Sequence, residues 1–166
     1  MKLNMSSFQS CRFIKLLAVC LIALGAILSL ATAVSAEAAP NALEIRVYRN
    51  PSCSCCGAWM AHLTDIGFQP KNFTTPDMST LKEQYGVPDN LASCHTAVIN
   101  GYVIEGHVPA EDIKRLLAEQ SDVAGIAVPG MPIGTPGMES GEVREPFTVF
   151  SFNKQGNAEV FNQYSF

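Results

Sequence analysis

The sequence lacks the features that mark several common classes of protein. Charged residues make up only 16% of its 166 residues and the formal net charge is −4, so a basic surface for nucleic acid is not indicated. Paired carboxylates, a nucleophile-elbow serine and a glycine-rich phosphate loop are missing, and so are internal repeats. These absences argue against a nucleic-acid-binding protein and leave six cysteines as the main source of chemistry.

Residues 1–36 have the layout of a secretory signal peptide. Three basic residues and no acidic residue precede the uncharged residues 16–34, and residues 34–36, Val-Ser-Ala, offer a small-residue cleavage site. An uncleaved membrane anchor is the alternative, because about 19 apolar residues can just span a bilayer. Cleavage would change the net charge from −4 to −7. We expect an exported, periplasmic protein without stable membrane insertion once it is cleaved.

Cleavage would also remove two cysteines and leave Cys53, Cys55, Cys56 and Cys94. An even number of cysteines in an exported protein first suggests two disulfides. The spacing argues against that, because a Cys55–Cys56 bridge would be strained and Cys53–Cys55 fits disulfide geometry poorly. Only Cys53–Cys56 has a spacing that suits a disulfide. A second disulfide would then have to join Cys55 to Cys94.

The apolar pattern predicts an α/β fold after a short linker, residues 37–42. Residues 43–120 read as strand, helix, strand, helix, strand, strand, helix, with alternation in the first strand and i, i+4, i+7 spacing in the first helix. Asn100-Gly101 is a strong hairpin signal, and Pro109 begins the last helix. This β-α-β-α-β-β-α order is thioredoxin-like, and the first crossover is expected to be parallel.

Two further segments follow this predicted core. Residues 121–146 contain nine Gly or Pro among 26 residues, which predicts a long loop that either acts as a lid or is disordered. Residues 147–166 alternate again around a central turn, which predicts a C-terminal β-hairpin.

The three clustered cysteines lie where the first strand gives way to the first helix. Cys53 is expected at the helix entrance and Cys56 one turn further in, where unpaired N–H groups and the helix dipole stabilise thiolates. Such a site suits both disulfide exchange and metal binding. Cys94 precedes the third strand, where thioredoxins have a peptide-docking cis-proline, so we expect it to face the cysteine turn. A thiol in that place favours metal binding.

The cysteine spacing favours copper over zinc. A four-thiolate zinc site usually takes two separated cysteine pairs, whereas three ligands within four residues crowd a single tetrahedral ion. Thiolates can bridge several ions and select Cu(I). The sequence therefore predicts several Cu(I) ions bound by Cys53, Cys55, Cys56 and Cys94.

Further candidate ligands lie near the predicted site and in the Gly/Pro-rich loop. They are His95, His107, Met131 and Met138. Neighbouring strand residues point to opposite faces, so Cys94 and His95 are not both expected to reach the site, and His95 can equally be a hydrogen-bonding strand residue. The methionines could add thioethers if the loop folds over the site.

Four motifs in this order resemble the CopG-like copper-resistance family, long catalogued as a domain of unknown function. They are Asn50-Pro-Ser-Cys-Ser-Cys-Cys, Ser93-Cys-His-Thr, Glu105-Gly-His-Val-Pro and Gly130-Met-Pro-Ile-Gly-Thr-Pro-Gly-Met-Glu. The resemblance covers about residues 43–152. It implies an exported thioredoxin-like protein that binds copper through these cysteines and has a role in interconverting Cu(I) and Cu(II).

We therefore expect an exported Cu(I)-binding protein of copper resistance and homeostasis. Its expected partners are copper ions and another envelope copper carrier or an electron donor. Whether it is an enzyme is left open; a redox reaction would use Cys53 and Cys56. One alternative is a thiol–disulfide oxidoreductase in which Cys53 attacks and Cys56 resolves. A second alternative is a zinc-binding structural module.

Overall fold

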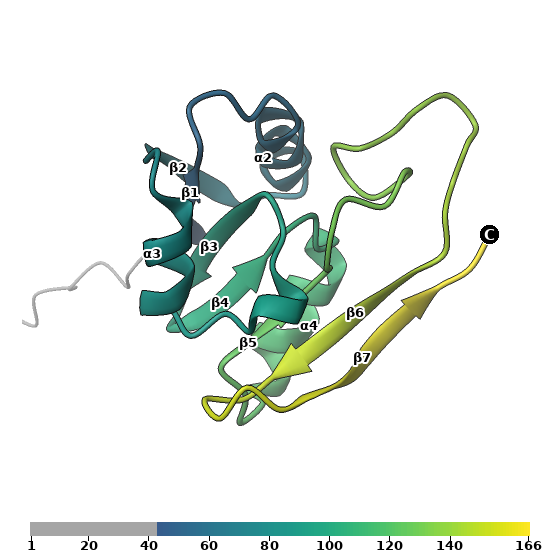
Figure 1. Ribbon diagram of the computed structural model, residues 1–166. Helices are drawn as coiled ribbons and strands as arrows, with labels where there is room; N and C mark the ends of the chain where they lie inside the picture. Colours follow the sequence, from purple (N-terminus) through teal and green to yellow (C-terminus); the bar gives the residue numbers. More distant parts are fainter. Residues whose placement is uncertain (1–42) are drawn as a thin grey trace, which may run out of the picture. The chain divides into compact units, whose positions relative to one another are not determined.

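The computed structural model describes residues 43–166 (Figure 1). The predicted signal peptide, residues 1–36, and the predicted linker, residues 37–42, lie outside the described residues. No helix in the described part of the chain is long and apolar enough to span a membrane.

The strands between residues 43 and 166 form one mixed sheet in the order β2-β1-β3-β4-β5-β6-β7. β1 and β2 are parallel, as expected for the first crossover, and β3 and β4 are antiparallel. The strands are β1 (Glu44–Arg49), β2 (Gln69–Thr74), β3 (His95–Ile99), β4 (Tyr102–Glu105), β5 (Gly125–Ala127), β6 (Phe147–Phe152) and β7 (Ala158–Tyr164).

Three α-helices connect these strands: α2 (Cys55–Asp65), α3 (Met78–Gln84) and α4 (Ala110–Glu119), with a short 3-10 turn η1 (Asp89–Leu91) before β3. α2 buries Trp59 and Leu63, which are four residues apart and so share one helical face. Asp77 caps α3 by accepting the backbone N–H of Thr80 at 3.1 Å. The mixed α/β fold predicted from the sequence is confirmed, with the strands and helices up to α4 in the predicted order.

The hairpin between β3 and β4 forms at the predicted turn. Asn100 and Gly101 both have positive φ, 48° and 86°, as a type I′ turn requires. The resulting register places Thr96 of β3 opposite Glu105 of β4. This pairing brings the motifs around Cys94 and His107 to the same end of the sheet.

The predicted loop over residues 121–146 is not without regular structure, because it contains β5. β5 pairs parallel with β4 and antiparallel with β6, so it joins the C-terminal hairpin to the rest of the sheet. A strand of three residues gives too short a pattern for periodicity to reveal. The later part of the loop lies against α2, where a Cβ on Gly137 would be only 2.5 Å from the backbone nitrogen of Trp59.

The predicted C-terminal hairpin forms from β6 and β7, and α4 anchors it. Asp112 of α4 is buried, and its carboxylate accepts hydrogen bonds from Asn162 Nδ2 at 2.9 Å and from the Tyr164 hydroxyl at 2.8 Å. A buried carboxylate needs such donors. The hairpin is therefore held by polar contacts as well as by Phe147 and Val149 in the core.

Candidate metal centre

The cysteine turn is shaped by the two residues at the end of β1 and just after it. Asn50 accepts the Ser52 N–H on its side chain at 2.9 Å and the Cys53 N–H on its carbonyl at 3.0 Å. The Arg49 guanidinium donates to the Cys53 carbonyl at 3.0 Å. The chain is thereby turned so that Cys53 precedes α2 and Cys55 begins it. The unpaired N–H groups of this helix end favour thiolates.

The structure brings the four predicted cysteines together. The Cys94 Sγ, from the segment before β3, lies 3.8 Å from Cys56 Sγ and 4.0 Å from Cys55 Sγ, while Cys53 and Cys55 sulfurs are 3.6 Å apart. All four Sγ atoms lie within 4.8 Å of one another. Two segments separated by 38 residues therefore supply one compact group of soft donors.

Two of these four cysteines are joined. Cys53 and Cys56 form a disulfide with Cα atoms 5.7 Å apart, and Cys55 and Cys94 are free thiols. A disulfide sulfur is not a thiolate, and the thiolate is the metal ligand. All four cysteines can therefore act as ligands only after this bond is reduced.

Two histidines contact Cys94. Its Sγ lies 3.1 Å from His95 Nδ1 and 3.2 Å from His107 Nε2, and the three residues form a second group of candidate ligands within 4.8 Å. Strand alternation does not separate the side chains of Cys94 and His95, and the alternative in which both lie near the site holds in the structure. The alternation rule applies inside a strand, whereas β3 begins only at His95 and Cys94 lies in the bend before it.

His107 is held in the form that a metal ligand requires. Its Nδ1 lies 2.7 Å from the Pro136 carbonyl, which can only accept, so Nδ1 carries the proton. Burial lowers the pKa of His107, against the opposing effects of the Pro136 carbonyl and Glu139. In the neutral ring the lone pair is then on Nε2, which faces the Cys94 sulfur.

His95 is fully buried against Trp59, with ring centroids 4.3 Å apart. Burial, followed by electrostatic coupling to His107 and the positive charge of Lys82, holds the pKa of His95 well below its usual range, so the ring is neutral. Its Nε2 is the one buried side-chain nitrogen or oxygen between residues 43 and 166 that has no hydrogen-bond partner. An unpaired buried nitrogen is costly, which singles out this ring as a feature that packing does not explain.

The Cys94 thiol is hard to ionise without a metal. Burial, then the neighbouring Cys55 sulfur, and to a lesser extent Glu105, raise the pKa of Cys94 to about 12. The two neutral imidazoles supply no cation to offset this. An ion bound by the Cys94 sulfur must therefore displace its proton.

Comparison with known proteins agrees with these motifs. A family model described as "Protein of unknown function, DUF411" matches residues 91–138, which include Cys94, His95 and His107. Two solved structures, "Copper resistance protein copG- Form 2" and "Form 1", are each 45% identical to the chain and cover 74% of it. The matches span 98% and 97% of those chains, with TM-scores of 0.71 and 0.70. This chain belongs to the CopG-like copper-resistance family. A search of curated proteins finds no match.

The donor set of this CopG-like chain fits a copper ion. Thiolate and imidazole are both ligands that copper accepts, and thiolates select Cu(I). The free thiols of Cys55 and Cys94 and the neutral rings of His95 and His107 are already gathered. Reduction of the disulfide would add Cys53 and Cys56. These six residues would hold the metal, which would supply the one-electron chemistry of copper.

The two loop methionines differ in exposure. Met131 is 52% exposed, and Met138 is half-buried in a turn where its N–H bonds the Thr135 carbonyl at 2.8 Å. Their part in copper binding stays a prediction. The loop itself reaches the centre through the Pro136 carbonyl on His107.

The sequence did not predict one buried carboxylate beside the candidate metal centre, that of Glu105. Glu105 is fully buried and contacts Lys82, Thr96 and the backbone of Ser93. Burial raises the pKa of Glu105, while the nearby Lys82 ammonium lowers it. One signal was available, because Glu105 is an acid at the end of an otherwise apolar strand inside a recognised motif.

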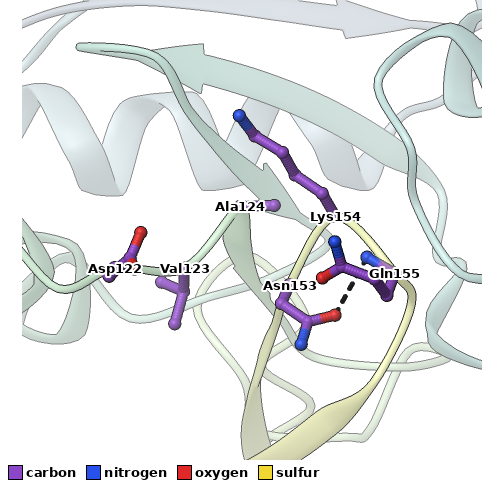
Figure 2. Close-up of a pocket in the computed structure, with 6 residues that line it drawn as sticks. All are labelled: Asp122, Val123, Ala124, Asn153, Lys154 and Gln155. Atoms are coloured by element: carbon purple, nitrogen blue, oxygen red, sulfur yellow. Dashed lines mark hydrogen bonds between the residues drawn. The ribbon is translucent and has the colours of Figure 1, made fainter.

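A surface cavity elsewhere on the chain is not part of this centre. It has a volume of about 290 Å³ and is lined by residues of the segment between α4 and β5 and of the β6–β7 turn, as Figure 2 shows: Asp122, Val123, Ala124, Asn153, Lys154 and Gln155. None of the candidate ligands lines it.

Proposed function

We propose that this chain is an exported copper(I)-binding protein of copper resistance that binds several copper ions through Cys53, Cys55, Cys56 and Cys94. One observation carries the proposal: four sulfurs from two distant segments lie within 4.8 Å of one another. A thiolate group this dense suits Cu(I), which accepts two or three soft ligands and shares bridging sulfurs. Membership of a copper-resistance family supports copper over zinc.

The proposal includes interconversion of Cu(I) and Cu(II). Imidazoles and thiolates next to each other give copper both nitrogen and soft sulfur ligands. Closing the Cys53–Cys56 disulfide from two thiolates releases two electrons, which two Cu(II) ions can accept to become two Cu(I) ions. In the reverse direction two Cu(I) ions would give their electrons to the disulfide and become two Cu(II) ions. Repeated reduction of Cu(II) would instead need an external reductant to restore the dithiol, and an envelope electron donor or copper carrier would be the partner.

A second candidate function, thiol–disulfide exchange, is favoured by a separate observation. Cys53 and Cys56 form the disulfide at the start of α2, as a redox turn would, and Cys55 lies 3.6 Å from the Cys53 sulfur. In this reading Cys53 attacks a partner and Cys56 resolves the mixed disulfide. Cys94 would then lie where a thioredoxin docks its peptide substrate.

One experiment distinguishes these functions. The protein is reduced, loaded anaerobically with Cu(I), and assayed for copper per chain and for free thiols. Copper binding by the reduced form, with most of it lost when the Cys53–Cys56 disulfide is formed first, supports the copper function. Absence of copper uptake together with insulin-reductase activity would contradict it and support exchange. Stoichiometric zinc that Cu(I) cannot displace would favour the zinc module.

A further inference from the structure

A buried ionic network lies directly behind Cys94. We use "Glu105 network" for Glu105, Lys82, Thr96 and the backbone of Ser93. The Glu105 side chain is 0% exposed and that of Lys82 only 15%. Glu105 Oε1 accepts hydrogen bonds from the Lys82 ammonium and from the Ser93 N–H at 2.6 Å, and Oε2 accepts one from the Thr96 hydroxyl at 2.7 Å.

Two members of the Glu105 network flank Cys94 and His95, the two candidate ligands of this segment. Ser93 comes immediately before Cys94, and Thr96 comes immediately after His95. One carboxylate therefore fixes both ends of the dipeptide whose side chains meet at the centre. Charge-assisted hydrogen bonds of this kind are short and directional, so they define position as well as contribute energy.

Close packing extends the same restraint to the other histidine. Gly106 connects Glu105 to His107, and its N–H donates to the His95 carbonyl at 2.9 Å. A Cβ on Gly106 would lie 2.5 Å from the Ser93 hydroxyl and 2.6 Å from the Val128 carbonyl. The segment around Gly106 therefore packs directly against the segment that contains Ser93, with no room for a side chain between them. The Glu105 network thus restrains the positions of Cys94 and His95. Through Gly106 it also restrains the backbone that leads to His107.

The stability of the fold does not by itself require an ion pair between Glu105 and Lys82. Replacing a buried ion pair with apolar side chains of similar volume is often neutral or stabilising, because two charges no longer have to be desolvated. The sheet and its apolar core are built from other residues, including Ile45, Val47 and Ile104. A role in positioning the neighbouring ligands accounts for the network where fold stability does not.

We propose that Glu105, with Lys82 as its counter-ion, is a positioning residue of the metal centre that holds Cys94 and His95 against the cysteine turn. The proposal rests on the copper-binding function proposed above. Residues behind the ligands of a metal site typically contribute 10–100-fold to metal affinity (about one to two orders of magnitude). A loss of that size on removing the network is the effect we expect.

Two variants of the full chain test this role. Glu105→Gln removes the charge and keeps the size, while Glu105→Leu combined with Lys82→Met replaces the pair with apolar groups. Asp112→Asn is the matched control, since Asp112 is also buried and accepts from Arg115, Asn162 and Tyr164, but in the network between α4 and β7. Circular dichroism and thermal unfolding establish that each variant is folded.

Cu(I) affinity is measured by competition with a chromogenic Cu(I) chelator. We expect both Glu105 variants to bind Cu(I) roughly 10–100-fold more weakly than the parent, and the control to stay within about twofold. Folded Glu105 variants with the parent's affinity would overturn the proposal. An equal loss in Asp112→Asn would also overturn it, because the effect would then be one of general destabilisation.

A metal-free measurement separates this proposal from the proposed function. The rate of alkylation at Cys94 is followed by peptide mass spectrometry in protein that retains the Cys53–Cys56 disulfide. Faster alkylation in Glu105→Leu/Lys82→Met, which removes both charges of the pair together, supports positioning when the control is unchanged, even if the parent protein fails to bind copper. An unchanged Cys94 rate overturns positioning, even if copper affinity falls.

Discussion

At the scale of single residues, Cys94 is the point where two ligand groups meet. It belongs to the group of four cysteines and also to the group with His95 and His107. A thiol shared in this way can bridge metal ions, whereas Cys55 belongs to the sulfur group alone. The two residues should therefore differ when each is replaced.

We predict that Cys55→Ser lowers the copper content of the reduced protein by about one ion or more, because it removes one of the four proposed thiolate ligands. The Cys53–Cys56 disulfide should still form, since its geometry does not involve Cys55. Copper per chain and the glutathione equilibrium of the disulfide measure the two effects. An unchanged copper content with an altered disulfide equilibrium would contradict the prediction.

Copper binding should also depend on pH through Cys94. Its pKa of about 12 means that the thiol is protonated at neutral pH and must release a proton to solvent when it binds the ion. Cu(I) affinity should therefore rise about tenfold per pH unit, for each thiol proton displaced, between about pH 7 and 9. His95 and His107 have lowered pKa values and stay neutral there, so they add nothing to this slope. Competition titrations at three pH values check it, and a flat profile would contradict it.

At the scale of elements, the 121–146 loop and α2 together form the outer wall of the candidate metal centre. Gly137 packs against the backbone of Trp59, and the neighbouring Pro136 carbonyl orients His107. Gly137 has a φ of +81°, which disfavours any side chain, and it also has no room for one.

We predict that Gly137→Ala destabilises the fold by about 1–3 kcal/mol and accelerates copper release, because the loop must move away from α2 and release His107. Gly141→Ala is the control, since Gly141 also has positive φ but has open space around it. Stopped-flow transfer of Cu(I) to a chelator, with urea unfolding, measures both effects. Equal release rates in the two variants would show that the loop contact does not matter.

Much of this architecture was accessible from the sequence because its signals are local. Asn100-Gly101 specifies its own turn, and the helix faces follow from spacing. β5 could not be found because three residues carry no period, and its place depends on pairing with two distant strands. The residues of the candidate metal centre likewise divide into those with a local sequence signal and those without one. The cysteines were predicted, whereas the approach of His95 depended on where β3 begins to within one residue.

The Glu105 network illustrates the harder part of such a prediction. Its members come from α3, β3, β4 and the segment before Cys94, so no spacing in the sequence reveals it. Lys82 on its own reads as an exposed helical lysine, and only the fold turns it inward to Glu105. Contacts that combine several elements are set by topology and not by local pattern.

At the scale of the whole molecule, the network around Asp112 ties the C-terminal hairpin to α4. We predict that Asp112→Asn lowers the free energy of unfolding by about 1.5–3 kcal/mol, because hydrogen bonds to a charged acceptor are lost or weakened. Copper content should not change, since none of the proposed ligands belongs to this network. Urea unfolding and copper analysis test this pair of outcomes. A loss of copper without a loss of stability would contradict the separation of the two networks.

The central claim is that the four cysteines act as one copper centre across two distant segments. Copper per chain in the reduced protein, loaded anaerobically with Cu(I), compared with Cys94→Ser tests this claim most directly. We predict about two or more copper ions per chain in the parent and a loss of most of them in the variant, because Cys94 joins both ligand groups. The same copper content in both proteins would contradict a centre that spans the two segments.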